Sequence, residues 1–550
     1  MDRRTFIEAS AIAGAMAGVA ALSGCSSPRT AGEAGQEKEQ GTTQLAPADY
    51  TVQADVVVVG AAGVSGYIAS LHAVDCGLDV HAIDRASGFG QTNNVQYGGV
   101  FALETPSKKA QPAWVSKEDF FNKFISTCNN QANFDVVRNM IVNSAETNAL
   151  VEEAADGFYS FAGEEPVTEL VPDLKYYGMY TCDCWPDDLY GDARAAVLDD
   201  QAASHGLKIN FECQATSLLF DGEKVYGVRY TDSEGKSVDA LAKNVIIACG
   251  GCAHNPELLA RLSKGGRAVG IGSPLVDGSG IQMAFDAGAA EGKCFALDMV
   301  EFGAGNVNAS PQISYLESEG PLTLMMGAGL FVNKEGRRFM PEQVIIGGIM
   351  FCSGTFTRNP SYYCVVDQAT VDKWSVTPIY EALGAAAEGL NPGMDMLWGD
   401  VVVEDMQEQM DAGVQAGWIF KGDTPEDLAA AMGFDALAET IVAYNGYCAA
   451  GHDDQFYKDA SLLVEMPQGP YYAVECMPAV FNTMGGVKVD GFCRALREDS
   501  TVIDGLFVVG SDADLWSNQY HYGNTAQGFE SMSGYLAADI CAGNEMNYQN

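Results

Sequence analysis

Three glycines and one acidic residue have the types and the spacing of a nucleotide-binding turn. Gly60, Gly63 and Gly66 follow four consecutive valines, Val56–Val59. Glycines at this spacing let the chain turn from a strand into a helix while the backbone stays close to a ligand. The N-terminus of such a helix presents free N–H groups and a positive dipole end to a pyrophosphate. Asp84 follows 24 residues after Gly60. This is near the ~20-residue distance at which an acid accepts hydrogen bonds from a ribose.

The elements that position these residues can be read from the same stretch. A run of four β-branched residues ending at a glycine is too short for a helix and is typical of a buried parallel strand. A helix follows whose apolar face is Ile68, Leu71 and Val74, and a second strand then covers Val80–Ile83. Read strictly as G-x-G-x-x-G, the motif keeps only Gly60, since other small residues, Ala62 and Ser65, hold the remaining places. A buried strand–helix–strand unit without a nucleotide is therefore the alternative.

Later segments extend the α/β pattern. Residues 117–160 and 193–206 are expected to be helical, and residues 209–227 to form a strand, a turn and a strand. A second buried strand, residues 245–251, ends in Gly250 and Gly251, which could approach a dinucleotide from its other side. The glycine- and amide-rich loop at residues 88–99 suits a planar ring system.

The composition is that of a soluble globular protein with a strong acidic imbalance. The 550 residues include 31 Lys and Arg against 73 Asp and Glu, for a net charge of −42. Such a chain cannot neutralise nucleic-acid phosphates, which excludes a nucleic-acid-binding protein. The charge permits a cationic partner such as a basic electron carrier, because opposite fields speed encounter. An adaptation for solubility is the alternative.

The 15 cysteines are scattered rather than spaced as in a disulfide scaffold. Two close pairs occur, Cys182 with Cys184 and Cys249 with Cys252. An iron–sulfur cluster normally takes four thiolates, and no local run supplies them. Most of these cysteines are therefore expected to be small buried apolar residues.

The first 25 residues resemble a targeting segment. Arg3 and Arg4 form a twin-arginine pattern, an uncharged Ala/Gly-rich run follows, and Leu22–Cys25 resembles a bacterial lipobox. We expect export by the twin-arginine route and a lipid anchor on the outer face of the cell membrane. Residues 26–49 have few large apolar side chains and are expected to be a flexible linker.

Several segments between residues 50 and 545 recur, in order, in one known family. They are Asp55–Arg85, the Gly98-Gly99 loop, Val245–Gly251, Gly278–Ala284, Gly329–Phe339, Thr483–Gly486, Gly505–Gly510 and Gly523-Asn524. The chain thus resembles the FAD-binding flavoprotein family of soluble fumarate reductases, urocanate reductases and ketosteroid dehydrogenases. The resemblance implies an α/β fold: a two-piece Rossmann-like FAD-binding domain at residues 50–298 and 482–550, and an inserted α+β capping domain at residues 299–481.

The resemblance also implies which residues bind FAD. Gly60, Gly63 and Val64 would bind the pyrophosphate, and Asp84 would bind the adenosine ribose. The other expected cofactor residues are Thr92, Asn93, Gly98, Gly99, Ala215, Gly250, Gly251, Ser511, Gly523, Asn524 and Ala526.

The expected substrate positions depart from the fumarate pattern. The family's His before Thr-Met-Gly-Gly is Asn482 here, and its Arg near the Gly-Asn pair is Tyr520. No His-Pro-Thr motif occurs around Asp298–Ala304, and the family's proton-donating Arg falls near Val371 or Asp372. A dicarboxylate would lose its bidentate Arg contacts at such positions. Fumarate is therefore not the expected substrate.

Catalytic roles follow from the same resemblance. Reduction of an activated alkene needs a hydride from the flavin, an acid for the α-carbon and a donor to the conjugated carbonyl. Tyr520 is the expected acid, and His521 or Tyr522 the expected carbonyl donor, although any one of them could instead pack on the flavin. Glu342 and Arg358 are candidates for a proton relay, with a structural ion pair as the alternative.

Within the family, the export signal, the many cysteines, the missing fumarate residues and Asn333 most resemble reductases of the butenolide lactone of cardiac glycosides. Asn333 and Asn482 would then bind the substrate, and a [4Fe-4S] cluster would accompany FAD. A membrane-anchored cytochrome c or a quinol-linked donor would supply electrons. The alternatives are a ketosteroid dehydrogenase, which also uses a Tyr, a reductase of another enoate used as a respiratory acceptor, and a non-catalytic flavin carrier.

Overall fold

The computed structural model describes most of the chain after Gln44. The described residues are 46–95, 99–110, 116–127, 130–154, 159–160, 182–184, 189, 191–264, 268–270, 272–304, 313–314, 320–324, 327, 329–345, 361–384, 402–515 and 525–548, with backbone alone for some of them, including 182–184 and 298–304. Contacts divide the chain into Met1–Pro47 and Ala48–Asn550, and only the second unit is described below. Within the described part, no helix is long and apolar enough to cross a membrane.

The predicted strand–turn–helix–strand unit is present. Strand β1 (Tyr50–Val59) leads into helix α2 (Val64–Asp75) and then strand β2 (Val80–Ile83), and the two strands pair in parallel. Burial explains the run of valines, because Val56, Val57 and Val58 have no exposed surface. The strand is longer than the predicted four residues, since its exposed first half pairs along β9 (Ser237–Ile247).

The larger sheet has parallel strands at its centre, and these strands come from both the N-terminal and the C-terminal parts of residues 48–550. Its main order is β17-β18-β9-β1-β2-β6, and β6, β2, β1, β9 and β18 are parallel neighbours. The remaining strands of this sheet are β6 (Ile209–Asn210), β7 (Gln214–Phe220), β8 (Val225–Thr231), β17 (Arg494–Leu496) and β18 (Val502–Val508). Because β18 lies beside β9, a C-terminal segment completes the sheet that the N-terminal segment begins. The two-piece α/β fold is thus confirmed.

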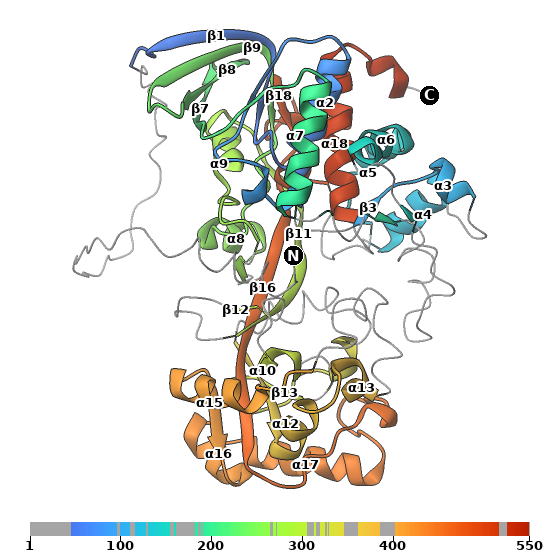
Figure 1. Ribbon diagram of the computed structural model, residues 1–550, viewed down its shortest axis with the longest axis vertical. Helices are drawn as coiled ribbons and strands as arrows, with labels where there is room; N and C mark the ends of the chain where they lie inside the picture. The colour runs from blue at the N-terminus through green and yellow to red at the C-terminus, as the bar shows by residue number, and fades with distance from the viewer. Residues whose placement is uncertain are drawn as a thin grey trace. The chain divides into compact units, whose positions relative to one another are not determined.

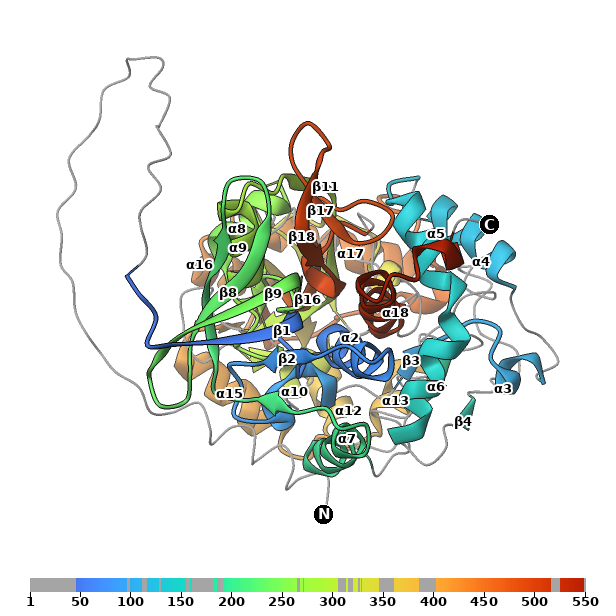
Figure 2. The same cartoon turned by 90° about the horizontal axis from the view of Figure 1, so that it is seen from above.

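Helix α18 (Thr525–Cys541) packs against α2, and the two helices lie side by side in Figures 1 and 2. The ring of His72 stacks on that of Tyr535 with centroids 3.6 Å apart. Gly534 allows this close packing, because a Cβ there would lie 2.2 Å from the carbonyl oxygen of Ser65. Helix α18 is thereby packed closely against α2.

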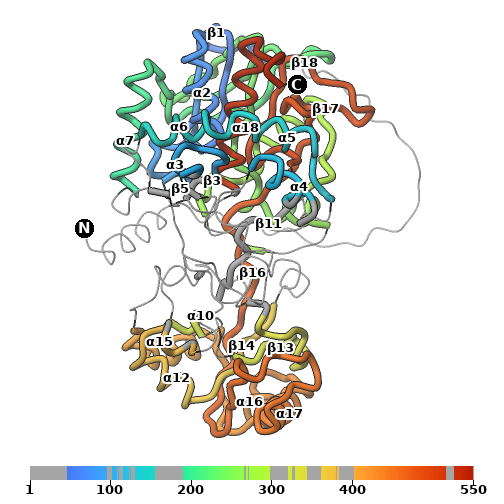
Figure 3. Tube along the Cα trace, turned by 90° about the vertical axis from the view of Figure 1, so that its right-hand side faces the viewer, coloured from blue at the N-terminus to red at the C-terminus, as the bar shows by residue number. Residues whose placement is uncertain are grey.

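The second sheet has the order β12-β11-β16-β14-β13, with β10 and β15 also paired to β16. Its strands are β10 (Val269–Gly270), β11 (Glu291–Ala304), β12 (Ile313–Ser314), β13 (Leu330–Val332), β14 (Tyr362–Asp367), β15 (Ile419–Gly422) and β16 (Tyr471–Val487). Strands β11 and β16 pair antiparallel from Glu291 and Val487 to Ala304 and Cys476 (Figure 3). The boundaries expected at residues 298/299 and 481/482 fall inside these two strands, and the division into domains stays a prediction.

A small third sheet contains β3 (Gly99–Phe101), β4 (Tyr159–Ser160) and β5 (Cys182–Cys184). The other described α-helices are α3 (Pro106–Lys109), α4 (Lys117–Thr127), α5 (Phe134–Val142), α6 (Ser144–Ala154), α7 (Asp192–Ser204), α8 (Pro256–Leu262), α9 (Ser279–Asp286), α10 (Gly320–Thr323), α12 (Gln368–Trp374), α13 (Ile379–Leu383), α15 (Met406–Ala416), α16 (Pro425–Met432) and α17 (Leu437–Ala450). Helices α4–α6 and α7 agree with the helices predicted at residues 117–160 and 193–206, except that residues 159–160 form strand β4.

Candidate FAD site

The turn after β1 is built for close approach. Gly60 has a φ of +85°, and a Cβ there would lie 2.3 Å from the carbonyl oxygen of Ala248. A Cβ on Gly66 would lie 2.1 Å from the carbonyl oxygen of Gly60. Gly63 precedes the first residue of α2, and no side chain caps that helix. Its first N–H groups are thus left for an external acceptor, and the helix dipole favours an anion.

A cavity lies at the carboxyl ends of β1, β2 and β9, which is where open α/β sheets bind their ligands. It encloses about 820 Å³, part of it open to solvent. Of the residues predicted to bind the cofactor, eight line this cavity: Gly60, Gly63, Val64, Asp84, Thr92, Asn93, Ala215 and Gly250. Residues from four separate stretches of sequence therefore meet where the glycine turn predicted a dinucleotide.

Asp84 stands at the end of β2 and is 7% exposed. Its Oδ2 accepts a hydrogen bond of 2.9 Å from the N–H of Ala62, and its Oδ1 accepts one of 2.8 Å from the N–H of Ala86. Burial raises the pKa of Asp84, while these N–H groups oppose the shift. The side chain both holds the glycine turn and faces the cavity, so its placement agrees with the predicted ribose contact.

Four other described residues that were predicted to bind the cofactor do not line the cavity. The N–H of Gly251 donates to Asp512, and Ser511 is buried against Asn482. Ala526 is buried on α18, and Gly99 begins β3. Three further candidates, Gly98, Gly523 and Asn524, lie outside the described residues.

Two acidic side chains of this region were missed at the sequence level. Asp512 belongs to a short 3-10 helix, Gly510–Asp512, and accepts hydrogen bonds from the N–H groups of Cys249, Gly250 and Gly251. Burial raises its pKa to about 6 despite these bonds. Its position just after the buried strand β18 repeats the signal that identified Asp84 after β2. That signal could have found it.

Glu530 is the second missed acid, and it lines the cavity from α18. Its Oε1 accepts a short hydrogen bond from the hydroxyl of Ser511 and one of 3.3 Å from the Nδ2 of Asn482. Burial raises the pKa of Glu530 to about 7, with a further contribution from Asp512. Because Glu530 is one helical turn after Ala526, i and i+4 periodicity places both on one face of α18. That spacing could have identified it.

Asn482 also lines the cavity, from β16. Its Nδ2 donates to Ser511 at 2.7 Å, and its Oδ1 accepts from the N–H of Thr483 at 2.8 Å. The side chain is 5% exposed, and these bonds together with the Glu530 contact occupy its amide group. Asn482 thus lies at the cavity, while its contact with substrate stays a prediction.

Arg85 is the only Lys, Arg or His among the described residues that line the cavity. Its Nη1 lies 2.8 Å from the Oδ2 of Asp277, and it also donates to the carbonyl oxygen of Leu275. Burial opposes ionisation of Asp277, but Arg85 holds the pKa of that carboxyl below its ordinary value. The cation is therefore already paired within the protein.

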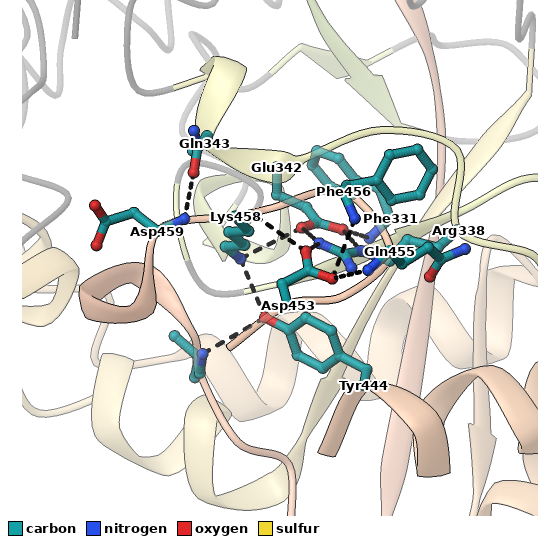
Figure 4. Close-up of polar contacts among 11 residues, drawn as sticks. Phe331, Arg338, Glu342, Gln343, Tyr444, Asp453, Gln455, Phe456, Lys458 and Asp459 are labelled. Atoms are coloured by element: carbon teal, nitrogen blue, oxygen red, sulfur yellow. Dashed lines mark hydrogen bonds and ion pairs between the residues drawn. The ribbon is translucent and has the colours of Figure 1, made fainter. Parts of the chain in front are cut away.

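Glu342 belongs to a buried ionic network elsewhere in the unit (Figure 4). It receives two hydrogen bonds from Arg338, of 2.8 and 2.7 Å, and its Oε2 lies 3.4 Å from the Nζ of Lys458. Arg338 also pairs with Asp453 at 2.7 Å. The two cations and two anions balance, with side-chain exposures between 0 and 4%. The structure therefore supplies an ion pair for Glu342, which was the alternative, and it is formed with Arg338. Arg358 lies outside the described residues.

Asn333 likewise does not line the cavity. Its Oδ1 accepts hydrogen bonds of 3.0 Å from the N–H groups of Glu335 and Arg337, which closes the turn after β13. This local role accounts for an Asn at that position. Its contact with substrate stays a prediction. Near the expected position of the family's proton-donating Arg, Val371 is buried and Asp372 accepts from Gln368 at 2.7 Å.

The described thiols give no four-cysteine site. The one described cluster of His, Cys, Asp or Glu that could hold a metal ion, His72–Cys76–Asp539, contains a single sulfur. The side chains of Cys182 and Cys184 are not described, so the iron–sulfur cluster stays a prediction. The expected catalytic residues Tyr520, His521 and Tyr522, and the targeting segment at residues 1–25, also lie outside the described residues.

Comparison with known proteins identifies the family of this chain and its cofactor. A model of the family described as "FAD binding domain" matches residues 55–529. The vinyl phenol reductase of Lactiplantibacillus plantarum is 27% identical over 477 residues, which cover 84% of this chain and 90% of that protein. The digoxin reductase of Eggerthella lenta is 24% identical over 552 residues, which cover 93% and 91%.

Solved structures share the fold. The open conformation of a flavocytochrome c3 fumarate reductase superposes with a TM-score of 0.59 at 22% identity, over 90% of this chain and 79% of that one. The 3-ketosteroid Δ1-dehydrogenase of Sterolibacterium denitrificans superposes with a TM-score of 0.65 at 16% identity, over 89% and 99%. The uncapped helix, the crowded glycines and Asp84 all fit a dinucleotide. The chain therefore belongs to the FAD-binding domain family, as an FAD-dependent oxidoreductase among its reductases of C=C bonds.

Proposed function

We propose that this flavoprotein reduces the activated C=C bond of a neutral α,β-unsaturated substrate, such as the butenolide lactone of a cardiac glycoside, rather than fumarate. One observation carries the proposal. Asn482 stands where the resemblance to the fumarate reductases places a His that binds the substrate, and its neutral amide lies at the wall of the cavity. A dicarboxylate needs charge-assisted donors, and Arg in particular binds carboxylates through two parallel hydrogen bonds.

The surroundings of Asn482 support the same view. Its amide is occupied by Ser511, Thr483 and Glu530, so it has little to offer a carboxylate. The neighbouring ionisable group, Glu530, supplies no positive charge to a carboxylate. Two of the reported relatives are named for vinyl phenol and for digoxin, and neither name denotes a dicarboxylic acid.

Bound FAD supplies the hydride for such a reduction. In the proposed reaction, Tyr520 protonates the α-carbon, and His521 or Tyr522 donates a hydrogen bond to the conjugated carbonyl. A positioned acid of this kind contributes ~10²–10⁴-fold to the rate. Replacement Tyr520→Phe should therefore slow turnover by that factor while FAD stays bound, and an unchanged rate would move the acid elsewhere.

We further propose export by the twin-arginine route and a lipid anchor at Cys25 on the outer face of the membrane. A cytochrome or a quinol-linked donor would then deliver electrons, which agrees with the cytochrome-containing fumarate reductases among the similar proteins. A [4Fe-4S] cluster is proposed as a second redox group. Iron and sulfide assays on anaerobically purified protein test it, and a content near zero would remove it.

A ketosteroid dehydrogenase is the second candidate, since the 3-ketosteroid Δ1-dehydrogenase shares the fold at a TM-score of 0.65. The two functions run in opposite directions. Reduction of the bound flavin by a saturated ketosteroid would support the dehydrogenase, whereas reoxidation of the reduced flavin by an unsaturated lactone would support the reductase. A reductase of another enoate would differ from the lactone reductase only in which acceptor reoxidises the reduced flavin.

The test is an anaerobic screen with reduced viologen as donor. Butenolides, vinyl phenols, enones, urocanate and fumarate are offered at equal concentration, and viologen oxidation is followed at steady state. We expect turnover with a neutral acceptor and little with fumarate. Fast turnover of fumarate would contradict the proposed substrate class, and protein purified without a flavin spectrum would contradict a flavoenzyme altogether.

A further inference from the structure

Acidic groups predominate around the FAD cavity. Asp84 and Glu530 line it, and Asp512 accepts hydrogen bonds from the lining residues Cys249 and Gly250. The one cationic side chain in the described lining, Arg85, is balanced by Asp277. FAD brings a pyrophosphate with two further negative charges. Each carboxylate near that group must then be stabilised locally or take up a proton.

The acids differ in how well the protein stabilises their charged forms. Asp84 accepts from two backbone N–H groups, and Asp512 accepts from three. Among the described residues, Glu530 has neither a backbone donor nor a cationic partner. Its contacts in the described part of the chain are a hydroxyl and an amide, and both bind Oε1. The Oε2 of Glu530 is therefore the carboxyl oxygen with the least support as an anion.

The groups that face Glu530 come from three neighbouring elements. Ser511 and the acidic Asp512 belong to the 3-10 helix, Asn482 to β16, and Ser65 to α2. Asp512 is the only one of these that carries a charge, and it disfavours a second anion. Elsewhere in the cavity, Asp84 is a further anion, Arg85 is neutralised by Asp277, and burial disfavours the thiolate of Cys249.

We propose that binding of FAD is coupled to the uptake of one proton by Glu530, whose neutral carboxyl then donates a hydrogen bond from Oε2 to the cofactor. The proton comes from solvent, and no bond other than the O–H forms. In this proposal Glu530 donates a hydrogen bond to the cofactor, whereas Asp84 accepts one. The inference rests on FAD binding and is independent of the substrate, so the acceptor screen cannot decide it.

The experiment measures protons and affinity on the full chain. Protein stripped of FAD is titrated with FAD at pH 8 in phosphate and in Tris, whose ionisation enthalpies differ, and the heats give the number of protons bound. We expect an uptake of about one proton, and a Kd for FAD that rises by up to about tenfold per pH unit above neutrality. Equal binding heats in the two buffers, after subtraction of the heats of dilution only, would mean that no proton is taken up. That result alone would overturn the proposal.

Two variants assign the proton. Glu530→Gln keeps the shape and a donor, so proton uptake should vanish and the Kd should lose its pH slope. Asp514→Asn is the matched control, because Asp514 is another buried acid with a pKa raised by burial to about 6, yet it does not line the cavity. This control should retain both the uptake and the slope. Uptake that persists in Glu530→Gln would overturn the assignment to Glu530, and far-UV circular dichroism verifies that both variants are folded.

Discussion

Asp84 serves the backbone and the cofactor site with the same carboxylate. Its two oxygens bind the N–H groups of Ala62 and Ala86, so the end of β2 is tied to the glycine turn that faces the phosphates. A sequence motif can predict that an acid belongs at this place. It cannot show that the acid also supports the turn, because that depends on where the backbone of Ala62 lies.

Replacement Asp84→Ala should therefore lower FAD affinity by about tenfold to 100-fold, since hydrogen bonds to a charged group contribute about 1.5–3 kcal/mol. The measurement is the ratio of FAD to protein after gel filtration, together with the Kd from flavin fluorescence. Asp55→Ala is a suitable control. Asp55 also accepts a backbone N–H, from Asp79, but it is absent from the cavity lining. Full FAD occupancy in Asp84→Ala would remove Asp84 from the site.

At the scale of the element, the turn between β1 and α2 depends on glycines for two separate reasons. Gly60 in this turn and Gly77, which lies between α2 and β2, both have positive φ values, +85° and +81°, which favour glycine. Only Gly60 is also crowded, with Ala248 where its side chain would be, whereas no atom lies within 4 Å of a Cβ on Gly77. Substitutions at Gly77 therefore test backbone strain alone, whereas substitutions at Gly60 test strain together with a steric clash.

Gly77→Ala should cost about 1 kcal/mol, the penalty for a left-handed non-glycine residue. Gly60→Ala should cost several times more and should also abolish FAD retention, because the turn must shift away from β9. Thermal unfolding of the FAD-free and FAD-bound forms measures both effects. Equal losses of stability in the two variants would show that the contact with Ala248 is unimportant.

The network around Glu342 is the second element-scale feature. Removing one charge from a buried pair typically costs about 3–5 kcal/mol, because the partner charge stays buried. Glu342→Gln should therefore destabilise the fold by this amount, measured by urea unfolding. The exposed pair of Glu234 and Lys236, with side-chain exposures of 69% and 53%, is the control, and Glu234→Gln should cost less than about 1 kcal/mol. A Glu342→Gln variant with full stability but slow turnover would instead support the proton relay.

The same network gives a pH dependence. Burial opposes ionisation of Asp453, but Arg338 and three backbone N–H groups hold its pKa at about 2. Since this is below the value in the unfolded chain, the stabilisation is complete above pH 4 and is lost as the pH falls toward 2. Acid unfolding should shift to higher pH in Asp453→Asn. An unchanged acid midpoint would show that another group controls acid unfolding.

At the scale of the molecule, the net charge of −42 should govern the rate of reduction by external donors. Opposite charges accelerate encounter, and salt screens the attraction. Reduction by the methyl viologen radical cation should slow as ionic strength rises, whereas reduction by anionic dithionite should accelerate. Stopped-flow absorbance of the flavin measures both rates. Parallel salt dependences for the two donors would exclude long-range electrostatic steering.

The sequence predicted the parallel sheet and much of the cavity because both depend on local signals. Valine runs, glycines at turns and an acid at a strand end are visible without knowledge of the partners. Local spacing could have marked the positions of Glu530 and Asp512, but their roles depend on contacts between distant segments, such as Glu530 with Asn482. The network of Glu342 was foreseen only as an alternative, and its true partners, Arg338 and Lys458, could be found only from the packing.

The pairing of β11 with β16 has a consequence for how such proteins diversify. The register between β11 and β16 ends at the pair Ala304 and Cys476, and the chain between these two residues includes β12, β13, β14, β15 and the first residues of β16. Everything between these two points can in principle be exchanged as a cassette without moving β1, β2, β9 or β18. Grafting that cassette from a relative with another acceptor should transfer specificity while the host keeps its own flavin affinity.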